Sequence, residues 1–121
     1  MVLNKMVGEN RCLEYDDGEL VALSIKDSQY FYCLMKRYED KLSRYVGRMT
    51  YLADEDIADV IQESFIRAYT HLNECDCDLK FSNWMYRIVH NQAINKIKKN
   101  RDNLRIGLED KEEFVEWLTD E

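Results

Sequence analysis

The chain has 121 residues, of which 45% are apolar and 34% are charged, a composition that indicates one globular domain and excludes a disordered or fibrous protein. It has no proline and only four glycines, which favours long helices over tight turns. No apolar run is long enough to span a bilayer, and the N-terminus does not resemble a signal peptide. We therefore expect a cytoplasmic protein without membrane contacts.

The spacing of the apolar residues predicts an all-α fold, with three main helices in a compact bundle, a short N-terminal helix and a short C-terminal helix. The N-terminal helix is expected over Glu19–Ile25, after a turn and cap signal at residues 16–18. The first long helix is capped by Asp27 or Ser28 and ends at Met49, with apolar residues at steps of three and four.

The second long helix is predicted to begin with a cap at Asp54 and to end at Leu72. The polar segment over residues 73–80 shows no periodicity and is predicted to be a loop. The third long helix follows a cap at Ser82 and ends near Asn100.

This third long helix carries most of the positive charge of a chain whose net charge is −7. Residues 80–105 contain seven basic and one acidic side chains, whereas residues 1–79 contain nine basic and sixteen acidic ones, and residues 106–121 contain one basic and seven acidic ones. A local basic segment is what a phosphate backbone needs, so nucleic-acid binding is one interpretation. A lysine-rich helix face that is simply solvated is the other.

No recognisable enzyme motif is present, since the sequence lacks a glycine-rich phosphate loop, a metalloprotease histidine pair and a serine–histidine–acid pattern. We therefore expect a non-enzymatic protein without a cofactor. The four cysteines are expected to be reduced, as thiols are in the cytosol. A zinc site formed by His71, Cys75 and Cys77 is the alternative to unpaired thiols in a loop, and we expect no metal.

The second long helix carries an acidic patch beside its apolar face. Asp59, Gln62 and Glu63 lie at spacings that bring them together on one side of a helix. Such a patch suits a basic partner helix, whose arginines can pair with the carboxylates. A solvated helix face explains the same pattern and is the alternative.

The third long helix begins with an aromatic cluster and ends with basic residues. Asn91, Asn95 and Lys98 share one face, where asparagine can pair with base edges and lysine with phosphates. Trp84 is spaced for burial with Phe81, so core packing competes with base stacking as its role. The residues that we expect to bind DNA are Lys80, Asn83, Trp84, Arg87, His90, Asn91, Asn95, Lys98 and Lys99.

Two runs of sequence, DEDIADVIQESFIRAYTHL and FSNWMYRIVHNQAINKIKK, are separated by the predicted loop. Together they resemble the second conserved domain of sigma factors, and in particular that of the small extracytoplasmic-function (ECF) group. The resemblance covers about residues 17–101. It implies a transcription initiation factor domain that binds core RNA polymerase and that recognises and melts the promoter minus-ten element.

The resemblance implies a partner for each surface. Asp59, Gln62 and Glu63 would dock on a coiled coil of the polymerase β′ subunit. The tryptophan helix would face promoter DNA, at the non-template single strand of the minus-ten element. In the family the loop before that helix captures a flipped-out base, and in this chain that loop carries the acids Glu74, Asp76 and Asp78.

The resemblance also divides the chain into an N-terminal extension (1–16), the sigma domain (17–101) and an acidic linker or tail (102–121). In the tail we expect a connector over Asp102–Gly107 and a short acidic helix over Lys111–Leu118. Full members of the group carry a second DNA-binding domain, so we expect a chain cut within the linker rather than a protein that works with one domain. The alternative function is a sigma-like interaction module that binds an anti-sigma factor and does not open DNA.

Overall fold

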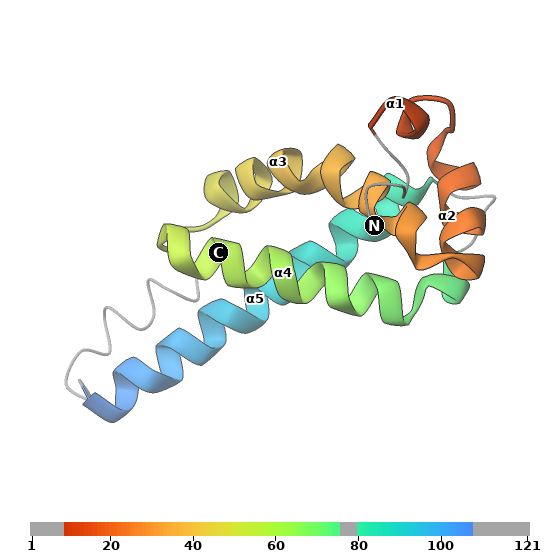
Figure 1. Ribbon diagram of the computed structural model, residues 1–121. Helices are drawn as coiled ribbons and strands as arrows, with labels where there is room; N and C mark the ends of the chain where they lie inside the picture. Colours follow the sequence, from red (N-terminus) through yellow and green to blue (C-terminus); the bar gives the residue numbers. More distant parts are fainter. Residues whose placement is uncertain (1–8, 76–79, 108–121) are drawn as a thin grey trace, which may run out of the picture.

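The computed structural model describes residues 9–75 and 80–107, and every regular element in these ranges is helical (Figure 1). The helices are α1 (Glu9–Cys12), α2 (Asp17–Lys26), α3 (Phe31–Met49), α4 (Asp54–Thr70) and α5 (Phe81–Gly107), and two short 3-10 helices are η2 (Ser28–Tyr30) and η3 (Leu72–Glu74). The predicted all-α fold with three long helices is confirmed. No helix in these ranges combines the length and the apolar character needed to cross a membrane. The helix predicted over residues 111–118 lies outside the described residues.

A capping box fixes the start of α2. The Asp16 carboxylate accepts a hydrogen bond from the backbone N–H of Glu19 at 2.8 Å, and the Glu19 carboxylate accepts one from the backbone N–H of Asp16 at 2.9 Å. The two side chains satisfy backbone donors that have no partner within the helix. The helix therefore begins at Asp17, two residues before the predicted start, and ends at Lys26.

The predicted caps of the next two helices are wrong in detail. Asp27 caps η2 through a hydrogen bond from the backbone N–H of Gln29, so α3 begins only at Phe31. Ala53 occupies the cap position of α4, and Asp54 is the first residue of that helix. The acids of this first turn still stabilise α4, because negative charge interacts favourably with the N-terminal end of the helix dipole.

The helix α5 is longer than predicted. It spans 27 residues and begins at Phe81 rather than after a Ser82 cap, and the Lys80 carbonyl accepts its first backbone hydrogen bonds. The connector expected over residues 102–107 is wrong, because these residues continue the helix to Gly107. No proline or glycine interrupts the sequence before Gly107, so no residue of the strong helix-breaking types ends α5 earlier.

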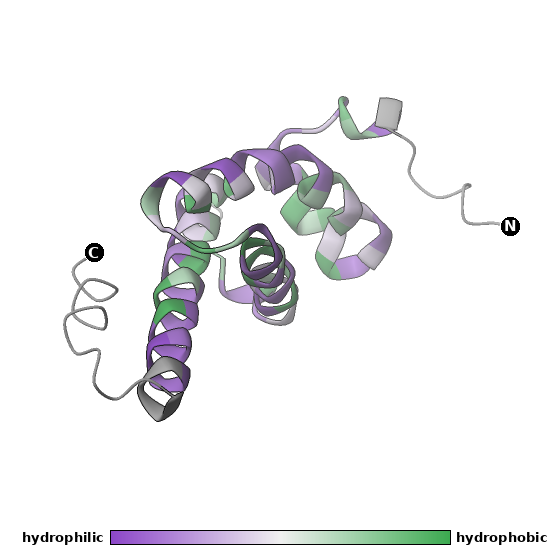
Figure 2. Cartoon of the chain, turned by 90° about the vertical axis from the view of Figure 1, so that its left-hand side faces the viewer, coloured by the Kyte–Doolittle hydropathy of each residue, from purple (hydrophilic) through white to green (hydrophobic). Residues whose placement is uncertain are grey.

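The three long helices enclose the core, and α2 packs against α3 and α5 at one end of the bundle (Figure 1). Apolar positions turn inward between the helices, and polar positions turn outward (Figure 2). Deeply buried apolar side chains include Leu20 and Val21 of α2, Leu34, Leu42 and Val46 of α3, Val60 and Ala68 of α4, and Met85, Val89 and Ala93 of α5. Burial of each large side chain contributes about 1.5–3 kcal/mol, so this shared core fixes how the helices are arranged.

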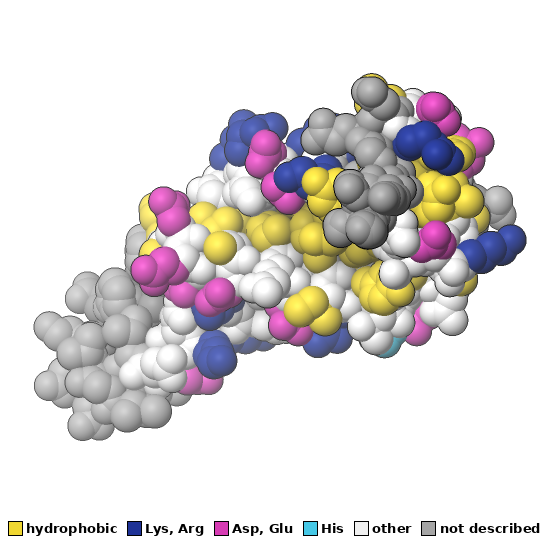
Figure 3. Space-filling model, viewed as in Figure 1, with side chains coloured by type: hydrophobic (Ala, Val, Ile, Leu, Met, Phe, Trp, Pro, Cys, Tyr) yellow, Lys and Arg dark blue, Asp and Glu magenta, His cyan; other side chains and the backbone are white. Residues whose placement is uncertain are grey.

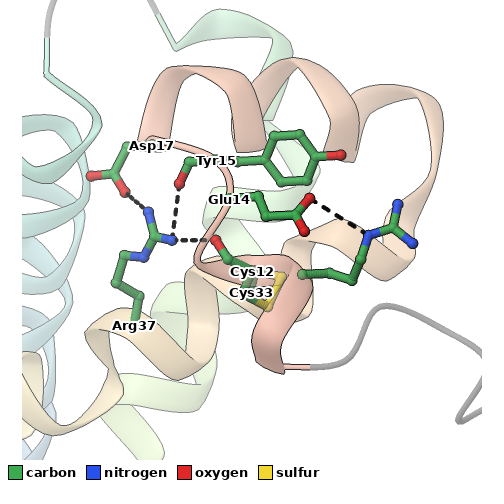
Figure 4. Close-up of a disulfide and its surroundings, with 7 residues drawn as sticks. Cys12, Glu14, Tyr15, Asp17, Cys33 and Arg37 are labelled. Carbon is green, nitrogen blue, oxygen red and sulfur yellow. Dashed lines mark hydrogen bonds and ion pairs between the residues drawn. A yellow bond between two sulfur atoms is a disulfide. The ribbon is translucent and has the colours of Figure 1, made fainter.

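A disulfide between Cys12 and Cys33 joins α1 to α3, with the two Cα atoms 5.4 Å apart (Figure 4). The Arg37 guanidinium holds the same segment, since it donates to the backbone carbonyls of Cys12 at 2.8 Å and Tyr15 at 3.1 Å and pairs with the Asp17 carboxylate at 2.8 Å. The expectation of reduced thiols is therefore wrong for this pair. The cysteine spacing does not reveal that α1 folds back onto α3.

Candidate functional site

The outward face of α5 is polar and exposed. Lys80 precedes the helix, and Asn83, Arg87, Asn91 and Lys98 follow at intervals of three, four, four and seven residues, which return to one side of a helix. All five side chains are exposed, and we call them the α5 stripe. The opposite side of the helix is core and consists of Phe81, Met85, Val89, Ala93 and Ile97. The stripe is therefore directed away from the bundle.

The cations of the α5 stripe differ from Lys96 in their ion pairs. The three cations of the α5 stripe have no carboxylate within ion-pair distance in the described part of the chain. Lys96 differs, since its Nζ lies 3.7 Å from Asp56 and 3.5 Å from Asp59, both on α4. Lys96 thus bridges two helices, whereas the cations of the stripe are available to an external anion such as a phosphate.

Two other residues predicted to bind DNA lie on the side of α5 that faces α4. Asn95 and Lys99 are exposed and line a polar pocket of about 250 Å³ between the two helices. Asp59 and Glu63 of α4 line the same pocket. Asn95 and Lys99 therefore lie between the α5 stripe and the acids of α4.

Trp84 and His90 combine exposure with packing. Trp84 is half-buried, and its ring centroid lies 5.9 Å from that of Phe81, which in turn packs on Tyr38 of α3 at 5.5 Å. His90 is exposed, with Nδ1 3.0 Å from the hydroxyl of Tyr45 on α3. Core packing and base stacking are therefore compatible roles for Trp84, because part of the ring packs on the core while the rest is open to solvent.

The predicted base-capture loop is described only in part. Glu74 is exposed, and its Oε2 lies 3.0 Å from Nδ1 of His71. Asp76 and Asp78 lie outside the described residues, as does Cys77, so the alternative of a zinc site, which we do not expect, is not tested. Within the described ranges, no three histidine, cysteine or acidic side chains come together as a metal site.

The acidic patch of α4 is exposed but borders two different neighbours. Asp59 and Glu63 line the polar pocket against α5, and Asp59 shares Lys96 with another carboxylate of α4. Gln62 lies on the other side and lines a groove between α3 and α4. All three residues are exposed on α4, but Asp59 and Glu63 border α5, whereas Gln62 borders α3.

The groove between α3 and α4 is the feature that the sequence prediction missed. It has a volume of about 600 Å³, an apolar floor that includes Phe31, Met35 and Phe65, and a rim with the acids Glu39 and Asp40. Hydrophobic side chains line the surface between these helices (Figure 3). Ile66 and Tyr69 of α4 also line it and remain 54% and 44% exposed. The sequence does hold one signal for this groove, since Ile66 is apolar but lies outside the predicted apolar face of the helix.

Comparisons with known proteins agree with this architecture. Residues 34–103 match the family model described as Sigma-70 region 2. The chain is 35% identical over 83 residues to the ECF RNA polymerase sigma factor SigW of Bacillus subtilis and 42% identical over 69 residues to the ECF RNA polymerase sigma-E factor of Salmonella typhimurium. These alignments cover 69% and 57% of the chain but only 44% and 35% of the relatives, so the chain spans less than half of their length.

A solved structure extends the comparison to three dimensions. It is the NMR structure of an engineered region 2 of sigma-E in complex with GTAAAA. It matches this chain with a TM-score of 0.69 and 37% sequence identity, and the match covers 75% of this chain and 95% of that one.

Proposed function

Since the chain belongs to the Sigma-70 region 2 family, we propose that it is the domain of a bacterial transcription initiation factor that binds core RNA polymerase and the promoter minus-ten element. The α5 stripe carries the proposal, because it offers a nucleic acid two asparagines and three cations that have no ion pair among the described residues. The solved relative with the same fold was determined in complex with GTAAAA. The chain acts by binding rather than by catalysis, in line with relatives that are named as sigma factors.

The α5 stripe has the chemistry of single-strand recognition. Lys80, Arg87 and Lys98 supply phosphate contacts, which position the strand without reading its sequence. Asn91 can pair with a base edge, and the exposed part of Trp84 offers a stacking surface. Three phosphate contacts to a single strand correspond to a salt dependence of log K on log[salt] of about −2.

The loop before α5 is proposed to capture a flipped-out base. Its acids Glu74, Asp76 and Asp78 can accept hydrogen bonds from base amino groups. Removing a base from its stack costs a few kcal/mol, which polymerase binding and capture of the base must offset.

The α4 surface is proposed to dock on the β′ coiled coil of polymerase. Asp59 and Glu63 offer carboxylates to basic residues, and Gln62 stands at the edge of the apolar groove. An apolar floor with acidic residues at its rim suits an amphipathic helix whose apolar face is flanked by basic side chains. The groove thus supports the assignment of α4 as a protein-binding helix.

The DNA half of the proposal is tested with fluorescently labelled single strands of GTAAAA and shuffled sequences, with and without core polymerase, at two salt concentrations. We expect Arg87→Ala to weaken binding to strands of every sequence and to reduce the salt slope by about 0.7. Asn91→Ala should reduce discrimination between sequences, because it removes a base contact. Lys36→Ala, which removes an exposed cation of α3 outside the α5 stripe, is the control, and equal losses in Arg87→Ala and Lys36→Ala would contradict the assignment.

The polymerase half is tested by the affinity of the full chain for core polymerase. We expect Asp59→Ala and Glu63→Ala to weaken binding, whereas Glu14→Ala, an exposed acid outside α4, should not. Unchanged affinity in both α4 variants would remove the docking assignment.

A second function is supported by the apolar groove alone. A sigma-like module that binds an anti-sigma factor without opening DNA would use a protein-binding groove and would not need the α5 stripe. Such a module would bind its partner but show no salt-dependent affinity for single strands, so the oligonucleotide titration separates the two functions.

A further inference from the structure

Helix α3 carries a row of cations that neither proposed surface uses. Lys41, Arg44 and Arg48 are spaced by three and four residues and are all exposed, so they lie on one side of the helix. None of them lies within ion-pair distance of a carboxylate in the described part of the chain. The other cations of α3 differ, since Lys36 pairs with Glu39 and Arg37 pairs with a carboxylate of α2.

Contacts between α3 and α5 show where this row lies. Tyr45 follows Arg44 directly, and its ring meets the Tyr86 ring edge-on at 5.2 Å, while its hydroxyl lies 3.0 Å from His90 Nδ1. At the other end of the row, Lys41 Nζ lies 5.5 Å from the centre of the Tyr38 ring, which packs on α5. The row therefore borders the seam where α3 meets α5.

The seam is aromatic and is flanked by positive charge on both sides. Tyr45 and Tyr86 are half-buried, and His90 is exposed. Glu39 and Asp40 of α3 line the groove against α4, and no carboxylate in the described ranges lies within ion-pair distance of the three cations of the row. Aromatic rings between rows of unpaired cations are the arrangement on which single-stranded nucleic acids stack and hold their phosphates.

We propose that the nucleic-acid surface continues from the α5 stripe across this seam onto α3. Lys41, Arg44 and Arg48 would hold phosphates, and the rings of the seam would support a base. This inference rests on the proposed function and adds that a bound strand extends beyond six nucleotides. Arg48 follows Lys41 by seven positions, a rise of about 10 Å along the helix, which matches roughly three phosphates.

The test compares GTAAAA with the same strand extended by four thymidines at its 5′ end or at its 3′ end, titrated with the full chain. We expect one extended strand to bind about tenfold more tightly, since stacking of one base and added phosphate contacts give at least that gain. Its salt slope should be steeper by about 2, which corresponds to three further phosphates.

The double variant R44A/R48A should lose the gain from the extension and keep the affinity for the six-nucleotide strand. K26A/K36A removes two exposed cations that are not part of the row on α3, and it should keep both the gain from the extension and the affinity for the six-nucleotide strand. Thermal unfolding of R44A/R48A should match the parent chain, because the two arginines are exposed and have no ion pair in the described part of the chain.

An equal affinity for short and extended strands would overturn the inference and leave the proposed function intact. An equal loss in R44A/R48A and K26A/K36A would also overturn it, since the effect would then be one of net charge. If the six-nucleotide strand does not bind but an extended strand does, and R44A/R48A abolishes that binding, the seam is supported and the assignment of the α5 stripe fails. If no strand binds, both fail.

Discussion

Arg37 and Tyr38 are neighbours in sequence and meet at one carboxylate. The Arg37 guanidinium pairs with Asp17 at 2.8 Å, and the Tyr38 hydroxyl donates a hydrogen bond to the other oxygen of the same carboxylate. Arg37 and Asp17 are about one-quarter exposed, and the Tyr38 residue is buried. Hydrogen bonds to a charged group in such a site contribute more than exposed ones, so this cluster anchors α2 on α3.

Tyr38→Phe should lower the stability of the chain by about 1–2 kcal/mol at neutral pH, because the Asp17 carboxylate loses a donor. Burial, followed by the hydrogen bond to the Asp17 carboxylate and its negative charge, raises the pKa of Tyr38 well above its usual range. In the unfolded state the phenol has a pKa of about 10 and releases its proton above that pH. The folded state keeps the proton at the same pH.

The sign of the pH effect follows from that difference. The stability contributed by Tyr38 is complete below about pH 10 and is lost as the pH rises above this value. Urea unfolding between pH 8 and 11 should show a steeper decline for the parent chain than for Tyr38→Phe. Parallel curves would show that the phenol does not hold its proton in the folded state.

Side-chain exposure on α5 follows from the sequence, whereas side-chain pairing does not. Of the nine residues predicted to bind DNA, eight are exposed and Trp84 is half-buried, as helical periodicity requires. Their roles stay predictions. The pairing of Asp59 with Lys96 and of His90 with Tyr45 depends on which helices pack together, and no local pattern in one helix contains that information.

The disulfide makes the short helix α1 part of the fold. A four-residue helix is unstable alone, and α1 is held by the Cys12–Cys33 bond and by Arg37. The bond spans 21 positions of the sequence, and closing a loop of this size stabilises a chain by about 3 kcal/mol in the chain-entropy account. Reduction should therefore lower the melting temperature.

Calorimetry with and without a reductant measures this effect. The double variant C12S/C33S should melt near the temperature of the reduced parent chain and should not respond to the reductant. A parent chain that melts at the same temperature in both conditions would exclude a stabilising role for the bond.

Gly47 weakens α3 without serving a turn. It lies within the helix, and a Cβ atom added there would lie 3.8 Å from Cδ1 of Ile57, an ordinary van der Waals distance. Gly47→Ala should therefore raise the free energy of unfolding by about 0.5–1 kcal/mol, the usual difference between alanine and glycine inside a helix. Urea unfolding measures the change, and a loss of stability would indicate that α3 and α4 approach more closely than this distance.

Helix ends were less predictable than helix existence. The apolar period of α3 and α4 is strong enough to identify both helices, but Asp27 and Asp54 do not take the cap positions assigned to them. The sequence over residues 102–107 has no regular apolar pattern, yet these residues continue α5 because no proline or glycine precedes Gly107. The helix propensities of these residues therefore predict the end of α5 better than the apolar periodicity does.

The two proposed surfaces lie on different parts of the molecule. The apolar groove lies between α3 and α4, whereas the α5 stripe points away from the core that these helices share. Sequence periodicity gave the direction of the stripe, but the groove arises only when α3 and α4 pack and leave Ile66 and Tyr69 partly exposed. A cavity of this kind is a property of two helices and could not be predicted from either one.

This separation predicts additive effects of substitution. Ile66→Ala should weaken polymerase binding and leave single-strand affinity unchanged, and Arg87→Ala should do the reverse. In the double variant the changes in each binding free energy should add to within about 0.5 kcal/mol, as for distant sites. Titrations of polymerase and of GTAAAA with all three variants measure this, and a larger deviation would show that the two surfaces communicate.

The ion pairs of Lys96 with Asp56 and Asp59 connect α5 to α4 and limit the energetic coupling between the two surfaces. In the proposed docking, a polymerase cation at Asp59 would compete with Lys96, so docking on α4 and the anchoring of α5 would be linked equilibria. Linkage is reciprocal, so DNA changes polymerase affinity by the same factor by which polymerase changes DNA affinity. A partly exposed ion pair contributes at most about 1 kcal/mol, which limits that factor to about fivefold. Any stronger cooperativity between the two partners would have to arise from a rearranged packing of α4 against α5.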